Sequence, residues 1–117
     1  MHIETYRDYC LLKPGVTEGF PFGADVLVFK VQGKMFALTD VDKFEFINLK
    51  CDPDRAIELR EGNPGITPGY HMNRHQWNSV STDGSVADPL MIELIDHSYD
   101  LIVASLPKKL RESLAKM

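Results

Sequence analysis

The segment VLVFKVQGKMFALT, residues 26 to 39, predicts the most regular part of the fold. Two runs rich in β-branched and aromatic residues flank Gln32-Gly33, and glycine tolerates the positive φ angle that a tight hairpin turn requires. A two-residue turn sets Phe29 opposite Phe36, and paired residues point to the same face of a sheet. The segment therefore predicts a β-hairpin in which the turn determines the two faces.

Those two faces differ in character. The face predicted to meet the core carries Leu27, Phe29, Val31, Phe36 and Leu38. The opposite face mixes apolar and polar side chains, namely Val26, Val28, Lys30, Met35, Ala37 and Thr39. A third strand, FINLK at residues 46 to 50, is expected to add Phe46, Asn48 and Lys50 to this mixed face. Because the mixed face is too polar for a core and notably apolar for a surface, it is the candidate functional surface.

Helices are predicted before and after these strands in the sequence. Residues near 2 to 12 place apolar side chains three and four positions apart. Asp52 and Pro53 form an N-cap and N1 pair for a second helix. Residues 89 to about 105 are broadly apolar, so a third helix should lie across the sheet, with a break and restart at residues 105 to 107.

Two further strands, at residues 66 to 72 and 77 to 81, complete the predicted order. Pro68 places the first of them toward an edge, because proline cannot donate to a strand ladder. The order α-βββ-α-ββ-α predicts an α+β fold, a two-layer α/β sandwich with helices on one face of a mostly antiparallel five-stranded sheet. The other face of that sheet is expected to be open.

Length and composition limit the class of protein. A chain of 117 residues suits one domain, residues 1 to 117, with a single hydrophobic core. No apolar run approaches the roughly 20 residues needed to cross a bilayer, and the first residues lack the features of a signal peptide. Cys10 and Cys51 form no CxxC pair, which argues against a disulfide framework or a cysteine-rich zinc site. We expect a cytoplasmic protein with no membrane partner and no cofactor.

Catalytic and metal-binding motifs are not found in the sequence. Asp96, His97 and Ser98 have the letters of a hydrolase triad, but consecutive helical residues point in different directions. His71 and His75 have the i, i+4 spacing of two ligands on one helix face, yet no third ligand lies at motif spacing. Neither a GxSxG nucleophile motif nor a glycine-rich phosphate loop ending in lysine occurs. We predict a protein that is not an enzyme, with no catalytic or metal-ligating residues.

Charge is unevenly distributed along the chain. The net charge is −4, but the tail, residues 107 to 117, holds four cationic side chains and one anionic side chain, a side-chain charge of +3. These residues are Lys108, Lys109, Arg111, Glu112 and Lys116. The rest of the chain then carries −7, the difference between −4 and +3. Such segregation creates a local basic patch on an acidic protein, although lysines near a helix C-terminus also complement the helix dipole.

The mixed face and the stretch GYHMNRHQWNSV, residues 69 to 80, supply the candidate binding residues. Cations beside aromatic and amide side chains are common in proteins that bind nucleic acids. The candidate DNA-contacting residues are Lys30, Lys34, Lys50, His71, Asn73, Arg74 and Trp77. The lysines and Arg74 would meet phosphates. His71 and Asn73 would fix the loop or donate to the backbone, whereas Trp77 would anchor the loop or stack.

The alternative interpretation is a protein-interaction module, chaperone-like or dimerising, that uses the open face of the sheet. A second subunit or a further segment would cover such a face, and Trp77 is more often a core anchor than a platform for bases. An affinity that falls steeply with salt would favour DNA, because phosphate contacts release counterions. Self-association that is insensitive to salt would favour the protein-interaction module.

Four segments together resemble a known family. They are KPGVTEGFPFGADVLVFKVQGKMFAL (residues 13 to 38), FINLKCDP (46 to 53), PGITPGYHMNRHQWNSV (64 to 80) and LIDHSYDLIVASLPKKLR (94 to 111). In this order they resemble the MmcQ/YjbR-like family of small bacterial proteins. The resemblance implies a compact α-βββ-α-ββ-α domain of the CyaY-like type, related in shape to secretion chaperones. It also implies a DNA-binding role, with Arg74 where the family pattern GYHMNK has lysine, and it implies no catalytic residue.

Overall fold

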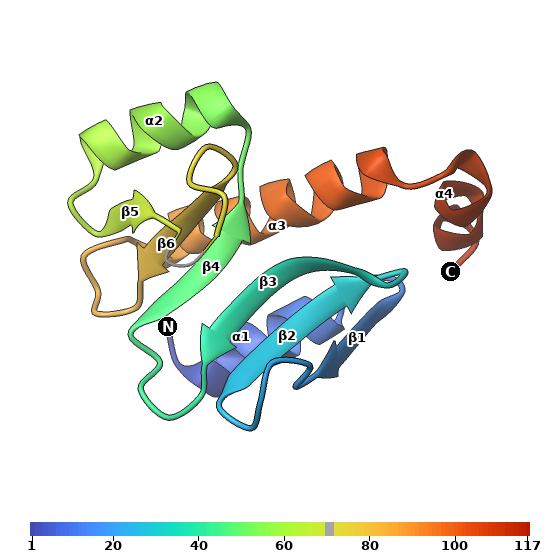
Figure 1. Cartoon of the computed structure of the whole chain (residues 1–117), viewed down its shortest axis with the longest axis horizontal. Helices are drawn as coiled ribbons and strands as arrows, with labels where there is room; N and C mark the ends of the chain where they lie inside the picture. The colour runs from blue at the N-terminus through green and yellow to red at the C-terminus, as the bar shows by residue number, and fades with distance from the viewer. Residues whose placement is uncertain (70–71) are drawn as a thin grey trace.

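A computed structural model describes residues 1–69 and 72–117 of the chain. Within those residues the chain forms four helices and six strands (Figure 1). The helices are α1 (Ile3–Leu11), α2 (Pro53–Gly62), α3 (Asp88–Ser105) and α4 (Lys108–Ala115). The strands are β1 (Val16–Gly19), β2 (Val26–Val31), β3 (Lys34–Asp40), β4 (Phe46–Lys50), β5 (Ile66–Pro68) and β6 (Trp77–Ser81).

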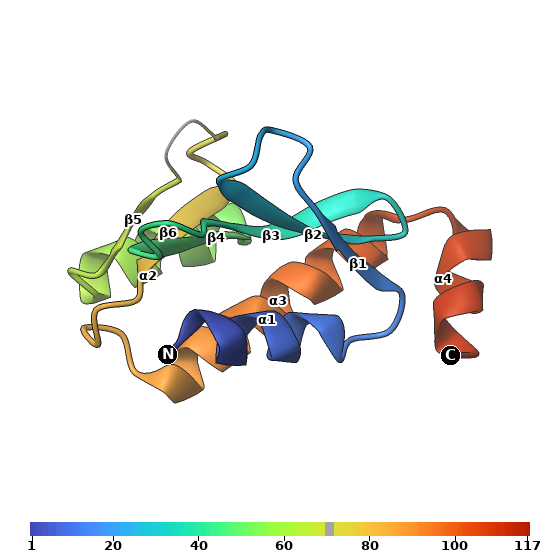
Figure 2. The same ribbon diagram turned by 90° about the horizontal axis from the view of Figure 1, so that it is seen from below.

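The six strands form one antiparallel sheet in the order β1-β2-β3-β4-β6-β5. Helices α1 and α3 lie against one face of this sheet (Figure 2). The opposite face, called the open face from here on, has no helix over it in the part of the chain that the structure describes. The predicted α+β two-layer sandwich is therefore confirmed.

The predicted count of five strands is wrong, because it omits β1 at the edge of the sheet. β1 has four residues, and the register places Val16 and Glu18 on the side that faces the helices. The Glu18 carboxylate accepts two hydrogen bonds from the guanidinium of Arg7 in α1, at 2.7 and 2.5 Å. The apolar alternation that identifies a half-buried strand is absent here, because an ion pair takes the place of the second apolar contact.

The β2–β3 hairpin turns at Gln32 and Gly33, as predicted, with φ angles of 48° and 83°. Positive φ at both central residues is the signature of a type I′ turn, which matches the twist of the flanking strands. Beyond the turn the register shifts, so that Phe29 pairs with Ala37 instead of Phe36. The shift is a β-bulge, in which one strand carries an extra residue.

The bulge changes which side chains face the core. Phe36 and Ala37 are both fully buried in the core, and Thr39 is buried beyond them. Leu38 lies on the open face, where it pairs with Val28. The predicted faces of Ala37, Leu38 and Thr39 are therefore wrong, because an extra residue in a strand reverses the alternation that follows it.

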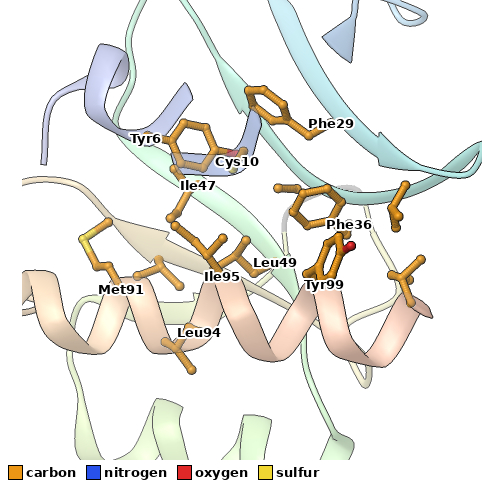
Figure 3. Close-up of a cluster of buried hydrophobic side chains, with 14 of the residues drawn as sticks. Tyr6, Cys10, Phe29, Phe36, Ile47, Leu49, Met91, Leu94, Ile95 and Tyr99 are labelled. Atoms are coloured by element: carbon orange, nitrogen blue, oxygen red, sulfur yellow. The ribbon is translucent and has the colours of Figure 1, made fainter. Parts of the chain in front are cut away.

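The hydrophobic core fills the space between the sheet and the helices α1 and α3 (Figure 3). Tyr6 meets Phe29 edge to face with ring centroids 5.4 Å apart, and Phe36 meets Tyr99 in the same way at 5.5 Å. Full burial of a large apolar side chain stabilises a fold by roughly 1.5–3 kcal/mol. The helix-covered face of the sheet therefore supplies most of the apolar stabilisation.

A polar cluster links the end of α1 to the middle of α3. The Asp96 carboxylate accepts a hydrogen bond from the Tyr9 hydroxyl at 2.6 Å and pairs with Lys13 Nζ at 2.5 Å. Lys13 Nζ also lies 5.1 and 5.0 Å from the ring centroids of Tyr9 and Tyr99, within cation–π range. The hydrogen bond to Asp96 raises the pKa of Tyr9 to about 12, so its hydroxyl remains a donor.

A second link joins the start of α2 to α3. Asp52 caps α2 as predicted, since its side chain accepts the Arg55 backbone N–H at 3.2 Å and Pro53 begins the helix. The Asp52 backbone N–H in turn donates to His97 Nε2 at 3.2 Å. Burial lowers the pKa of His97, and the charge of Arg55 adds to this effect. The neutral imidazole is therefore the form that this contact requires, because only it offers an acceptor nitrogen.

The chain breaks at Pro107 and restarts as α4, as predicted. Leu106 and Leu114 are buried, and a Cβ on Gly15 would clash with Cδ2 of Leu114. Gly15 also has a φ angle of 73°, so this contact with α4 depends on glycine. In the described residues no helix is both long and apolar enough to span a bilayer.

Candidate binding groove on the open sheet face

The register aligns a row of side chains across the middle of the open face. Leu38 pairs with Val28 on one side and with Asn48 on the other. Ser79 pairs with both Asn48 and Thr67, so the row continues to the far edge of the sheet. The row is apolar in β2 and β3 and polar in β4, β6 and β5. Leu38, Asn48 and Thr67 remain accessible to solvent, whereas Val28 and Ser79 are buried, so the accessible part of the row combines one apolar side chain with two polar ones.

Charges of opposite sign lie at the two ends of the open face. At one end Lys30 pairs with Met35, and Lys50 pairs with Trp77. At the other end Val26 pairs with Asp40. The following turn carries Asp42 and Lys43, and Glu45 immediately precedes β4. The face is thus polarised, since β2 and β4 run in the same direction and both bring a lysine to the same end.

Two cavities on this face share Asp40 and Asn48, and we call the combined depression the open-face groove. The first cavity, of about 560 Å³, is lined by Phe22, Val26, Met35, Leu38, Thr39, Asp40, Asn48 and Met72. The second, of about 470 Å³, is lined by Asp40, Lys43, Glu45, Phe46, Asn48, Thr67, Pro68 and Ser79. Each lies within the size range of typical ligand sites. The groove therefore crosses the sheet from β2 to β5.

Two loops rise beside the groove on the side away from the helices (Figure 2). The β1–β2 loop brings Phe22, which is 65% exposed, and the segment before β6 brings the half-buried Met72. Phe46, 40% exposed, borders the second cavity. These side chains give the groove apolar walls that solvent reaches.

The polar groups of the groove are held in defined positions. The Ser79 hydroxyl donates to Asn48 Oδ1 at 2.6 Å, which orients the Asn48 amide. Asp40 Oδ1 accepts the backbone N–H groups of Asp42 and Lys43, at 2.9 and 3.2 Å, and so fixes the turn at the acidic end. A hydrogen bond with Asp25, together with the charge of Asp25, raises the pKa of Asp42. Crowded carboxylates thus border one end of the groove.

The structure separates the predicted lysines. Lys30 and Lys50 lie on the open face, as predicted. Lys34 pairs with the buried Val31 and lies on the helix side of the sheet. Its Nζ donates to the backbone carbonyl and hydroxyl of Ser105, at 3.5 and 3.4 Å, at the C-terminal end of α3. A cation at this position interacts favourably with the helix dipole.

The predicted loop residues lie next to the start of β6. Asn73 Oδ1 accepts the His75 backbone N–H at 3.0 Å, and the Asn73 carbonyl accepts the N–H groups of Gln76 and Trp77. Asn73 therefore fixes the loop, which was one of its two predicted roles. Arg74 is exposed. The prediction for His71 lies outside the described residues.

Trp77 is 8% exposed, which fits the predicted anchor better than a stacking platform. Gly69 packs against it so closely that a Cβ on Gly69 would stand 2.8 Å from the Trp77 Cβ. An indole buried in this way contributes to stability through packing, because its burial leaves no room for a nucleic-acid base to stack on the ring.

None of the residues that line the groove was among the predicted site residues, and the apolar part of the groove includes Phe22, Leu38 and Met72. Phe22 had a signal in the sequence, since the loop GFPFG places two aromatic residues between glycines. Leu38 had none, because its position depends on the bulge.

Neither cysteine has the environment of a reactive thiol. Burial raises the pKa of Cys10 to about 12 and that of Cys51 to about 11, so both side chains stay protonated at neutral pH. Across residues 1–69 and 72–117, no three His, Cys, Asp or Glu side chains are grouped as metal ligands.

Comparison with known proteins places the chain among small proteins of similar length. It is 38% identical over 107 residues to the uncharacterized protein YbdF of Escherichia coli O157:H7, covering 91% of this chain and 88% of that one. It is 30% identical over 118 residues to the uncharacterized protein YjbR of Escherichia coli strain K12, with both chains covered completely.

Solved structures show the same fold. The crystal structure of Deinococcus radiodurans protein DR2400, described as a DUF419 domain, is 38% identical with a TM-score of 0.91, over 97% of this chain and 87% of that chain. A Pseudomonas syringae protein is 28% identical with a TM-score of 0.74, over 86% of this chain and 98% of the other. Residues 11–101 match the YjbR family as a whole. The resemblance seen in the sequence motifs is confirmed, and the chain belongs to the YjbR family.

Proposed function

We propose that the protein is a non-enzymatic binding module that holds an extended segment of a protein partner in the open-face groove. The exposure of Phe22 beside a groove floor of Met35 and Leu38 carries this proposal. Apolar side chains grouped around a depression are typical of sites that bury them against a partner. An extended segment suits such a groove, because its side chains alternate and its backbone supplies hydrogen-bonding groups.

Photo-cross-linking in living cells tests this proposal with a matched pair of positions. A photoreactive amino acid is placed at Phe22 in one variant and at Ile57 of α2 in the other. Both residues are exposed and apolar, at 65% and 49%, but Ile57 lies on a helix away from the groove. We expect discrete protein adducts from position 22 and none of the same mass from position 57. Equal adducts from both positions, or none from position 22, would contradict the proposal.

DNA binding is the second candidate function, and the arrangement of Lys30 and Lys50 supports it. These lysines lie at one end of the open face, and the loop with Arg74 adjoins Lys50, since the Cys51 N–H donates to the Gln76 carbonyl at 2.7 Å. Cations arranged in this way are suited to contact phosphates. The contribution of Trp77 to such a surface would be limited to holding the loop, given its burial.

An NMR titration with a short mixed-sequence duplex, at low and moderate salt, tests the DNA candidate. Shifts at Lys30, Lys50 and residues 73–76 that weaken with salt would support it, because phosphate contacts release counterions. Spectra that stay unchanged at low salt would contradict it. Lys30→Gln serves as the site variant and Lys34→Gln as the matched control, since Lys34 lies on the helix side.

A further inference from the structure

The open-face groove has a chemical character that narrows the class of partner. The apolar floor of the groove, the amide of Asn48 and the acidic end are each complementary to a different chemical group on a bound partner. We propose that the groove takes a cationic, apolar, extended peptide segment, with apolar side chains on Leu38 and Met35, a backbone carbonyl on the Asn48 amide, and a lysine or arginine at the acidic end. This inference rests on the proposed function and specifies the partner that the same site would accept.

The Asn48 amide supplies the first argument. Its Oδ1 already accepts the Ser79 hydroxyl at 2.6 Å, which leaves the two protons on Nδ2 as donors. Within the described residues Asn48 Nδ2 donates no hydrogen bond. Asn48 lines both cavities, so the donor lies at the centre of the groove. A peptide carbonyl is the complementary group, and leaving such a donor unpaired under a bound apolar segment would cost affinity.

The apolar floor supplies the second argument. Leu38 reaches the open face because of the bulge in β3, and it pairs directly with Asn48 in β4. Met35 and Phe22 border the same cavity. An apolar side chain next to a hydrogen-bond donor matches the repeat of an extended chain, in which side chains and carbonyls follow each other closely. Methionine adapts to side chains of different shape, so the floor accepts more than one apolar residue.

Charge complementarity supplies the third argument and decides the sign of the partner. Asp40 and Glu45 line this end of the groove together with Lys43. Asp42 lies next to Asp40 in the adjoining turn, and its carboxyl is hydrogen-bonded to that of Asp25. The hydrogen bond with Asp25, followed by the charge of Asp25, raises the pKa of Asp42, so two carboxyls lie close together there. A cationic side chain would be attracted to this acidic end, whereas a nucleic acid or an acidic segment would be repelled.

Fluorescence polarisation with three labelled peptides tests the inference. All three alternate leucine with a second residue, which is lysine, glutamine or glutamate. We expect the lysine peptide to bind the wild-type protein at least about tenfold more tightly than the glutamate peptide at low salt. Leu38→Glu should abolish binding of the lysine peptide. Met35→Glu is the second groove variant, and circular dichroism verifies that each variant is folded.

Two further variants separate the groove from general attraction to an acidic protein. Asp42→Asn is expected to lower the affinity for the lysine peptide about threefold. Glu58→Gln, which removes the same charge from an exposed position on α2, should leave that affinity unchanged. Asn48→Asp keeps an acceptor for Ser79, removes the Nδ2 donor and adds a negative charge. A loss of affinity in Asn48→Asp despite the added charge would support the carbonyl contact.

The outcomes distinguish this inference from the proposed function. If all three peptides bind equally and Leu38→Glu blocks them, the groove binds peptides but the cationic specificity is wrong. If Asp42→Asn and Glu58→Gln weaken binding equally, attraction is non-specific and the inference is overturned. If no peptide responds to Leu38→Glu or Met35→Glu, the groove is not the binding site, and both proposals fail.

Discussion

The two faces of the sheet are built from the same strands, but one face forms the core and the other lines the groove. On the helix-covered face, Phe36, Ile47 and Leu49 are at most 2% exposed and contribute to one continuous core. On the open face, Met35, Leu38 and Asn48 remain half-buried and line a groove. Alternation along a strand thus divides stabilising residues from residues that are available for binding. Substitutions of equal size on the two faces should therefore have unequal effects.

The largest expected difference is between two phenylalanines. Phe36→Ala should lower the free energy of unfolding by about 3–5 kcal/mol, because it leaves a cavity in the core. Phe46→Ala, at a position that is 40% exposed, should lower it by less than about 1 kcal/mol. Urea denaturation followed by circular dichroism measures both. Similar losses for the two variants would show that the open face is part of the stabilising core.

A smaller effect is expected at the polar cluster between α1 and α3. Asp96→Ala should lower the free energy of unfolding by about 1–2 kcal/mol, since Tyr9 and Lys13 both lose their partner. Asp100→Ala is the matched control, because Asp100 is an exposed carboxylate on the same helix. Chemical denaturation of the two variants at neutral pH tests this. Equal stability of the two variants would mean that the cluster contributes nothing.

The pH dependence of stability should report the contact between His97 and the start of α2. The pKa of His97 is lowered in the folded protein, so its stabilising contribution is complete above the unfolded pKa of about 6.5. That contribution is lost as pH falls from there through the folded pKa, where protonation removes the acceptor for the Asp52 N–H. We expect a loss of less than about 1 kcal/mol between pH 7 and 5.

His97→Gln should reduce this slope, because the glutamine carbonyl stays an acceptor over the whole range. His75→Gln, in the exposed loop before β6, is the matched control. Thermal melts at intervals between pH 5 and 8 provide the measurement. An unchanged slope in His97→Gln would assign the pH dependence to other groups.

The smallest expected difference compares two lysines of the β2–β3 hairpin. Lys34→Gln should lower stability by about 0.3–1 kcal/mol, because its Nζ contacts the C-terminal end of α3. Lys30→Gln, on the open face, should change stability by less than about 0.5 kcal/mol. Parallel urea titrations detect this difference. A larger loss for Lys30→Gln would place a stabilising role on the open face.

Much of the fold could be predicted from local patterns. The Gln32-Gly33 turn, the Asp52-Pro53 helix start and the break before α4 all follow from backbone preferences of individual residues. β1 could not be predicted from its own pattern, because Glu18 stands where a half-buried strand would carry an apolar residue, and its partner Arg7 belongs to α1. The family motifs, in contrast, were sufficient to identify the YjbR family.

The candidate site was less predictable than the fold. Lys30, Asn48 and Lys50 were correctly assigned to the open face, since the extra residue of the bulge lies in β3 and the alternation within β2 and β4 continues. Leu38 lies on the face opposite to the one that simple alternation predicts, whereas Lys34, a candidate DNA contact, lies on the helix side, where its pairing with Val31 places it. Whether Lys30, Lys50 or Arg74 contacts DNA stays a prediction.

The amino-acid sequence alone was enough for the order of the elements other than β1, the hairpin turn, the cap of α2 and the family, because each depends on residues close together in the chain or on ordered motifs. The groove depends on tertiary structure. A bulge turns Leu38 outward, and two loops distant in sequence bring Phe22 and Met72 to the same cavity. Contacts between distant segments arise only when the whole core has formed, since packing against the helices sets the register and curvature of the sheet.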